Sequence, residues 1–255
     1  MTEITLVRGD AQMWGTATGS GPTVLLLHAG GEERSVWTPV AAVLSRRNLR
    51  IVAYDLRGHG ASSGQARTLA PIAADVTAMI QREPTPLVVV GASLGGLAAI
   101  ASLADPLPAQ AVAGLILVDV VPDPDAARVR AWLDDRGLRD HRAELVENIF
   151  EHSPELLATA TKLELPILLV RGGPTSPLAD PEVDRFRAAV PTVTVARIPD
   201  AGHLVARDAP EDLACLIANQ ASTWLARRRR TGRGWPTGWA LFHVQRRGRR
   251  GRLGE

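Results

Sequence analysis

Residues 87–100 read Leu-Val-Val-Val-Gly-Ala-Ser-Leu-Gly-Gly-Leu-Ala-Ala-Ile, and this stretch decides the fold. The apolar residues before Gly91 are typical of a buried β-strand, whereas the Leu- and Ala-rich residues after Ser93 are typical of a helix. Gly91 and Gly95 stand two positions before and after the serine, where a very sharp strand-to-helix turn leaves no room for side chains. We therefore predict that Ser93 lies on such a turn, with its hydroxyl pointing out of a sheet beside a helix N-terminus.

Short apolar runs alternate with longer helix-like stretches through the first 200 residues. Strands are expected at 4–7, 12–17, 23–28, 50–55, 87–91, 114–119, 166–171 and 192–198. Helices are expected near 36–46, 69–83, 94–104, 181–190 and 210–228. Several strands, such as 24–27 and 115–118, are apolar without interruption, which is typical of strands buried on both faces of a parallel sheet. The sequence therefore predicts an α/β fold, with a mostly parallel central sheet of about eight strands and helices on both faces.

Three further motifs occupy the loops that follow predicted strands. Residues 25–31 read Leu-Leu-Leu-His-Ala-Gly-Gly, residues 55–62 read Asp-Leu-Arg-Gly-His-Gly-Ala-Ser, and residues 199–203 read Pro-Asp-Ala-Gly-His. Together with the Gly-x-Ser-x-Gly turn, they resemble the α/β-hydrolase superfamily over about residues 4–226, and within it the serine esterases and the haloperoxidase-like branch. The resemblance implies the α/β-hydrolase fold and a cofactor-free serine hydrolase of carboxylesterase type.

The resemblance also implies roles for individual residues. Ser93 would be the nucleophile and His203 the general base, because a serine hydroxyl is a poor nucleophile unless an imidazole accepts its proton. The backbone amides of Gly30 and Leu94 would form the oxyanion hole, which stabilises the negative charge that develops on the substrate.

Two other histidines of the motifs, His28 and His59, are expected to shape their loops rather than to react. The His-Gly pair that the family usually carries after the third strand is His-Ala here. A positive φ at this position would strain Ala29, because only glycine adopts that backbone conformation without a steric penalty.

The acid of a catalytic triad is absent from its usual place. After the Arg-Gly-Gly of 171–173, where Ser176 or Pro177 replaces the expected Asp, the next acid is Asp180. Asp180 comes late in this loop, directly before Pro-Glu, and resembles a helix N-cap. Asp119, at the end of the sixth strand, is the alternative, since haloalkane dehalogenases and some other relatives carry their acid there. We take Asp119 as the third catalytic residue, and leave open that Asp180, or no acid, has this role.

Residues 122–165 interrupt the alternation of strands and helices and are expected to form a lid of two or three short helices. Eight apolar residues of this segment are candidates for a wall above the nucleophile: Trp132, Leu133, Leu138, Leu145, Ile149, Phe150, Leu156 and Leu157. A short lid favours small or medium esters or related acyl substrates. Peroxide-dependent acyl oxidation, and a non-catalytic binding protein that keeps the fold, are the alternatives.

Charge is divided unevenly along the chain, which carries 29 Lys and Arg residues against 27 Asp and Glu residues, a net charge of +2. Residues 227–255 hold ten Arg and one Glu, a net charge of +9, which leaves −7 for residues 1–226. We therefore expect a hydrolase domain over 1–226 and a basic, disordered tail over 227–255. The tail contains no recognisable nucleic-acid-binding module, so we expect no nucleic-acid partner.

Other features concern location and partners. No apolar run reaches the ~18 residues that a membrane span needs, and the N-terminus has no secretory signal. The single cysteine, Cys215, cannot form an internal disulfide. No cofactor motif or metal-ligand spacing is present. We expect a cytoplasmic enzyme without cofactor or metal whose partner is a small-molecule acyl substrate.

Overall fold

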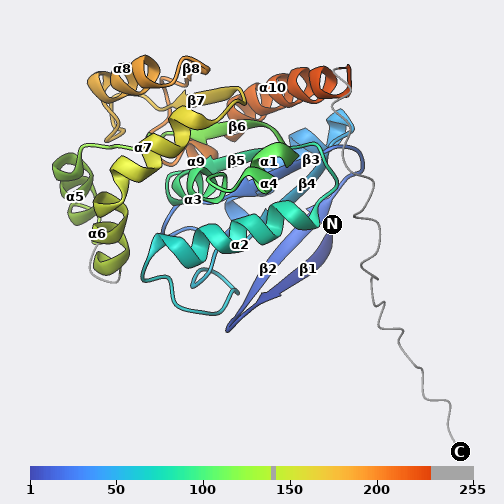
Figure 1. The fold of residues 1–255 in the computed structure, drawn as a ribbon, viewed down its shortest axis with the longest axis horizontal. Coiled ribbons are helices and arrows are strands. Elements are labelled where there is room, and N and C mark those ends of the chain that lie inside the picture. The colour runs from blue at the N-terminus through green and yellow to red at the C-terminus, as the bar shows by residue number, and fades with distance from the viewer. Residues whose placement is uncertain (139–141, 231–255) are drawn as a thin grey trace, which may run out of the picture.

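The computed structural model describes residues 1–138 and 142–230 of the 255-residue chain, with an eight-stranded sheet covered by helices on both faces (Figure 1). The strands are β1 (Thr2–Arg8), β2 (Ala11–Thr18), β3 (Thr23–Leu27), β4 (Arg50–Tyr54), β5 (Leu87–Ala92), β6 (Val112–Val118), β7 (Ile167–Arg171) and β8 (Val193–Arg197). Their order across the sheet is β1-β2-β4-β3-β5-β6-β7-β8. β2 is antiparallel to β1 and to β4, whereas all other neighbouring strands are parallel. The predicted α/β fold with a mostly parallel sheet is confirmed.

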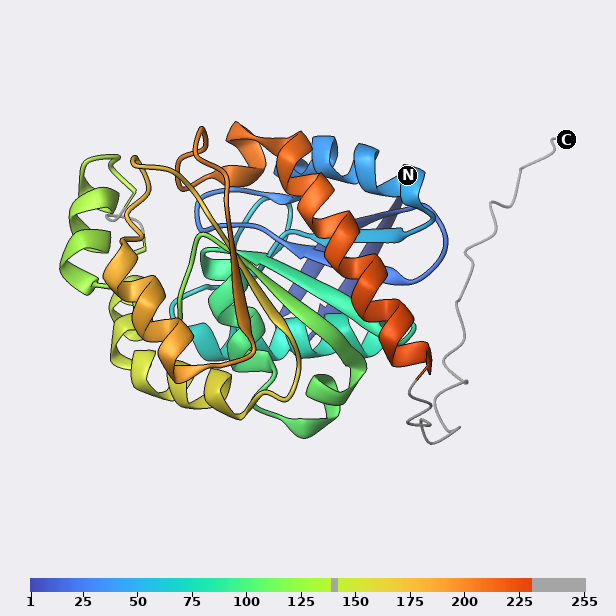
Figure 2. The same ribbon diagram turned by 90° about the horizontal axis from the view of Figure 1, so that it is seen from above.

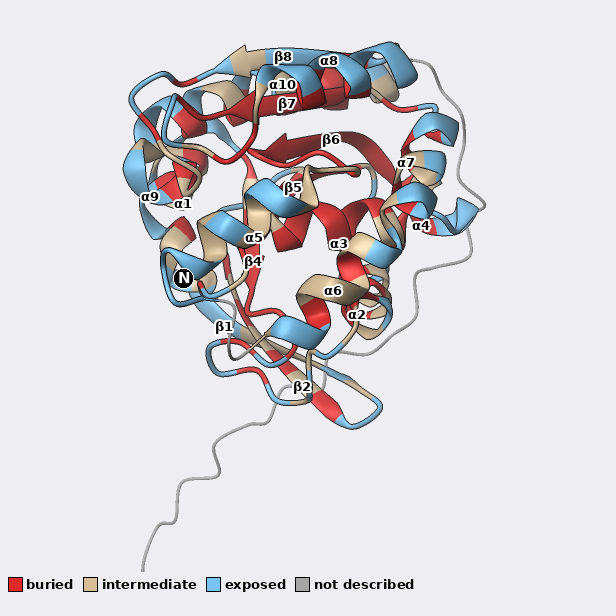
Figure 3. Ribbon diagram, turned by 90° about the vertical axis from the view of Figure 1, so that its left-hand side faces the viewer, coloured by how far each residue is buried: buried red, intermediate tan, exposed pale blue. Residues whose placement is uncertain are grey.

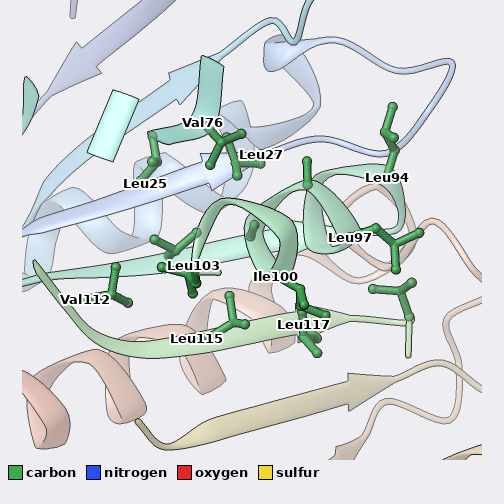
Figure 4. Close-up of a cluster of buried hydrophobic side chains, with 14 of the residues drawn as sticks. Leu25, Leu27, Val76, Leu94, Leu97, Ile100, Leu103, Val112, Leu115 and Leu117 are labelled. Atoms are coloured by element: carbon green, nitrogen blue, oxygen red, sulfur yellow. The ribbon is translucent and has the colours of Figure 1, made fainter. Parts of the chain in front are cut away.

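The central strands are buried on both faces, as their uninterrupted apolar sequences predict. Leu25 and Leu27 of β3 belong to one core, and Val24 and Leu26 of the same strand belong to the other. Helices α2 (Leu69–Arg82) and α3 (Leu94–Ser102) cover the first face, and Figure 4 shows their side chains against β3, β5 and β6. Helices α1 (Thr38–Leu44) and α10 (Pro210–Arg230) pack together over the second face (Figure 2).

The ends of the predicted strands and helices differ from the observed ones by at most two residues, but one helix is divided and two short helices are additional. The predicted helix at 36–46 is divided into η1 (Arg34–Trp37), α1 and η2 (Ser45–Arg47). Helices α4 (Pro106–Ala111) and α9 (Val205–Asp208) were not predicted, because helices of six and four residues are too short for an apolar periodicity to emerge. Helix α8 (Asp180–Ala189) lies where a helix was expected.

The segment 122–165 contains three short helices, α5 (Ala126–Asp134), α6 (Ala143–Glu151) and α7 (Ser153–Lys162). α5 and α6 lie beyond one end of the sheet, which Figure 3 views directly. No residue of α5 is fully buried, whereas Leu145 and Ile149 anchor α6 in the core beneath. The lid segment is therefore attached through α6 and α7, and α5 is more exposed.

Parallel strands bring the loops that follow them to one edge of the sheet. Gly30 follows β3, Ser93 follows β5, Asp119 follows β6 and His203 follows β8. The four residues are far apart in the sequence, and this shared edge places them at one site.

Candidate active site

Ser93 occupies the turn between β5 and α3. Its backbone has φ 45° and ψ −114°, a conformation that residues other than glycine rarely adopt. A Cβ atom on Gly91 would lie 2.5 Å from the Gly95 carbonyl carbon, and one on Gly95 would lie 2.5 Å from the Leu27 oxygen. Both flanking positions therefore require glycine, because the backbone of neighbouring segments comes too close for a side chain. This is the reason that we inferred from the spacing of the glycines in the sequence.

The loop after β3 lies against the beginning of α3. A Cβ atom on Gly30 would be 3.8 Å from the Leu94 Cβ, so the two residues proposed for the oxyanion hole are neighbours. Leu94 is the first residue of α3, where backbone amides have no acceptor within the helix. In this loop Gly31 has a positive φ of 84°, and Ala29 does not have one. The replacement of glycine by Ala29 therefore introduces no backbone strain.

Asp119 directly follows β6, and its fully buried carboxylate accepts three hydrogen bonds. His203 Nδ1 lies 2.8 Å from Oδ2, and the Gly172 amide donates to Oδ1 at 2.7 Å. The Ser176 hydroxyl also donates to Oδ2. Bonded in this way, the His203 ring carries its hydrogen on Nδ1, and the lone pair of Nε2 is left to accept a proton from another group.

Ser176 is a residue of the site whose role the sequence did not reveal. It stands in the loop where the resemblance led us to expect an acid, and its hydroxyl contacts the same carboxylate oxygen as His203 does. The Ser176 Oγ also accepts a hydrogen bond from the Leu178 amide at 3.0 Å, which orients the hydroxyl toward Asp119. Its position in the loop after β7 was the only signal in the sequence that could have found it.

Asp180 has a different environment. Its carboxylate forms an ion pair with Arg171, which lowers the pKa of Asp180, and 72% of its side chain is exposed. The prediction that Asp180 is a helix N-cap is wrong, because Asp180 is the first residue of α8 and Ala179 precedes the helix. The Glu182 carboxylate accepts from the Ala179 amide at 2.9 Å and thereby takes the place of a capping side chain.

His28 and His59 are buried, and their ring nitrogens bond to backbone groups of the loops after β3 and β4. His28 Nδ1 donates to the Ala29 oxygen at 2.8 Å, and its Nε2 accepts from the Leu56 amide at 2.9 Å. His59 Nδ1 donates to the Arg57 oxygen at 2.9 Å. Burial lowers the pKa of both rings, in His59 to about 4, so both are neutral near pH 7. Their bonding suits loop-shaping residues.

A cavity of about 350 Å³ lies between the edge of the sheet and the lid segment. Its floor includes all five residues predicted for the site, namely Gly30, Ser93, Leu94, Asp119 and His203. The ring of Trp132, on α5, lies edge-on to the His203 ring with 4.7 Å between their centroids. The candidate residues and the lid segment thus enclose one space.

Six of the eight apolar lid residues line this cavity, namely Trp132, Leu133, Leu138, Leu145, Ile149 and Phe150. The expectation was wrong for Leu156 and Leu157. These two residues lie on α7, which packs against α3, and they contribute to the core on that face of the sheet instead.

Three other expectations concern the described part of the chain. Among residues 1–138 and 142–230, no group of three His, Cys, Asp or Glu side chains is arranged to hold a metal ion. No helix described there combines the length and apolarity that crossing a membrane requires. α10 continues through Arg230, so the first four residues of the predicted tail belong to a helix, and 231–255 lie outside the described residues.

The sequence matches the profile of the "Alpha/beta hydrolase family" over residues 24–214. The chain belongs to this family. Over 109 residues it is 38% identical to protein phosphatase methylesterase 1 of Bos taurus, an overlap that covers 40% of this chain and 28% of that protein. Over 140 residues it is 34% identical to the esterase Rv0045c of Mycobacterium tuberculosis, which covers 50% of this chain and 42% of that protein. The matched region thus spans less than half the length of either relative.

Solved structures with the same fold include esterases. A thermophilic esterase from Thermogutta terrifontis superimposes with a TM-score of 0.72 at 23% identity, over 88% of this chain and 100% of that chain. A putative aryl esterase from Burkholderia cenocepacia gives 0.73 at 21% identity, over 89% and 100%. At these identities the likeness establishes the fold of this family member.

Proposed function

We propose that this protein is a cofactor-free serine hydrolase of carboxylesterase type, which cleaves small or medium esters or related acyl substrates through an acyl-enzyme. The observation that carries the proposal is the 2.8 Å contact between His203 Nδ1 and Asp119 Oδ2, beside a cavity that Ser93 also lines. An esterase and a methylesterase among the relatives of this chain support esters as the substrate class. The cavity volume is near the lower end for ligand pockets, which supports small or medium substrates.

In the proposed reaction, the Ser93 Oγ attacks the ester carbonyl carbon while His203 Nε2 accepts the hydroxyl proton. The carbonyl oxygen becomes an oxyanion that accepts hydrogen bonds from the Gly30 and Leu94 amides. Collapse of this intermediate breaks the bond to the alkoxy oxygen, which takes the proton from Nε2 and leaves as an alcohol. Water then attacks the acyl-enzyme with His203 again as base, and releases the acid and Ser93. Asp119 stabilises the imidazolium in both halves.

A fluorophosphonate probe, which reacts covalently with activated serines, tests the proposal. We expect labelling of the wild type, none of Ser93→Ala, and strongly slowed labelling of Asp119→Asn. Asp180→Asn is the matched control, because it removes the carboxylate of the other acid considered for the triad, at the start of α8. Failure of the folded wild type to label at Ser93 would overturn the proposal in favour of a non-catalytic binding protein.

A further inference from the structure

Arg142 lies immediately before α6 and lines the same cavity as Ser93 and His203. The side chain is half-buried, and loss of solvent lowers the pKa of its guanidinium. Arginine nevertheless remains protonated in proteins, so this residue of the cavity lining carries a positive charge at all physiological pH values.

The other charged side chains that line the cavity are each bonded to a partner among the described residues. The Glu32 carboxylate, whose pKa is raised chiefly by burial, accepts a hydrogen bond from Arg207 at 3.0 Å. Glu182 forms an ion pair with Arg128, and Asp119 is bonded to His203. Within 1–138 and 142–230, Arg142 forms no ion pair with any carboxylate. It is a cavity cation that the described residues leave uncompensated.

The contact that Arg142 does form is with a neutral group. One guanidinium nitrogen contacts His59 Nε2. Because His59 Nδ1 donates to the Arg57 oxygen, Nε2 is free to accept from the arginine, and the low pKa of His59 keeps the ring uncharged. His59 therefore positions the guanidinium without neutralising it, and most of the five N–H donors remain for another acceptor.

A second residue of the cavity lining carries a hydrogen-bond donor that lacks an acceptor. Trp132 lines the cavity, and its indole N–H is buried without a hydrogen-bond partner among the residues that the structure describes. Buried donors without acceptors are rare in native proteins, because each sacrifices the hydrogen bonds that it makes in water. A ligand that carries hydrogen-bond acceptors and negative charge would correct both deficits.

We infer that Arg142 binds a carboxylate carried by the substrate, so that the preferred substrates are half-esters of dicarboxylic acids or closely related anionic acyl compounds. This inference rests on the proposed esterase function and adds the substrate class. The planar guanidinium matches a carboxylate with two parallel N–H···O bonds. A half-buried cation is unfavourable where the described residues provide no counter-ion, and the substrate carboxylate supplies an opposite charge.

Kinetics on matched substrates test this subsite. The charged series is the mono-nitrophenyl esters of succinic, glutaric and adipic acids, and each neutral analogue has an isopropyl group in place of the carboxylate. In the wild type we expect kcat/KM to favour at least one charged ester over its analogue by about 10- to 100-fold, the range for hydrogen bonds to charged groups. This ratio should decline as salt is added, because salt screens the interaction.

Arg142→Gln keeps a donor for His59 and removes the charge, so the ratio of charged to neutral kcat/KM should fall to about one, whereas Arg142→Lys should keep part of it. Arg67→Gln is the matched control. Arg67 pairs with Glu144 of α6 at 3.7 Å and lies outside the cavity lining, so the ratio should be that of the wild type. The inference would be overturned if the wild type preferred none of the three charged esters over its neutral analogue. It would also be overturned if Arg142→Gln left the ratio of charged to neutral kcat/KM unchanged.

Calorimetry separates this inference from the proposed function. Glutarate is titrated into Ser93→Ala and into Ser93→Ala/Arg142→Gln, neither of which needs to react. Binding that disappears with Arg142 supports the subsite even if no ester is hydrolysed, and equal or absent binding in the two variants counts against it. Hydrolysis of the neutral esters that depends on Ser93 supports the esterase function whatever the charged series shows.

Discussion

Replacing Asp119 by Asn tests which acid serves His203. The Asp119 Oδ1 accepts from the Gly172 amide, so the amide oxygen of an asparagine would take that position. Its NH₂ group would then face His203 Nδ1, where the carboxylate oxygen now lies at 2.8 Å. Because an NH₂ group cannot accept a hydrogen bond, the imidazole would adopt the other tautomer. Nε2 would carry the hydrogen, and the ring could not accept the proton of Ser93.

The expected loss is large. The same replacement in a serine protease of known mechanism lowers turnover about 10⁴-fold. Asp119 is buried and its carboxylate accepts three hydrogen bonds, so the same replacement should have a similar effect here. We expect kcat/KM to fall about 10³- to 10⁴-fold, which corresponds to a loss of about 4–5 kcal/mol of transition-state stabilisation. Asp180→Asn removes the exposed partner of the buried Arg171, at a residue outside the cavity lining, and should leave kcat/KM within about threefold.

The assay is hydrolysis of nitrophenyl butyrate, with thermal denaturation to show that each variant is folded. A second variant, which moves the carboxylate from position 119 to position 176, makes the test more specific. The Ser176 hydroxyl contacts the Asp119 oxygen that faces His203, so a carboxylate at position 176 would lie close to the same ring. Adding Ser176→Asp to Asp119→Asn places a carboxylate in the neighbouring loop and should recover at least about tenfold of the lost activity. A folded Asp119→Asn enzyme that keeps more than a tenth of wild-type kcat/KM, or an equal loss in Asp180→Asn, would refute the reasoning.

Three further outcomes are expected. The pKa of His59 is about 4 in the folded protein and 6.5 ordinarily, so between pH 4 and 6.5 the unfolded chain binds more protons than the folded one. The free energy of unfolding should therefore rise by about 3 kcal/mol from pH 4 to 6.5. His59→Asn should flatten this dependence in urea titrations, and an unchanged slope would contradict the buried neutral ring. Gly95→Ala would place a Cβ 2.5 Å from the Leu27 oxygen and should cost about 1–3 kcal/mol in chemical denaturation, with a loss of esterase activity; a wild-type midpoint would argue against the tight turn. A chain that ends at Arg230 should keep the esterase kcat/KM, and a clear loss would assign the remaining residues a role in catalysis.

Much of the fold could be predicted because its causes are local. The uninterrupted apolar runs at 24–27 and 115–118 must be buried on both faces, and they lie in strands of the central sheet. The glycines beside Ser93 indicate a turn in which Cβ atoms would collide, and the backbone distances agree. Short helices such as α4 and α9 escaped prediction, since fewer than two turns carry too little pattern and their stability comes from packing.

The candidate site divides in the same way. The sequence by itself determined that Ser93 stands on a strand–helix turn and that His203 follows the last strand, because each depends on residues within a short distance along the chain. Only the tertiary structure decided which carboxylate meets His203, and that Ser176 and Gly172 hold it, because Asp119 and His203 are 84 positions apart in sequence. It also brought Arg142 to the cavity, where it contacts His59 and pairs with no carboxylate of residues 1–138 and 142–230. Such contacts depend on how loops from separate strands converge at one edge of the sheet, and no local pattern encodes that geometry.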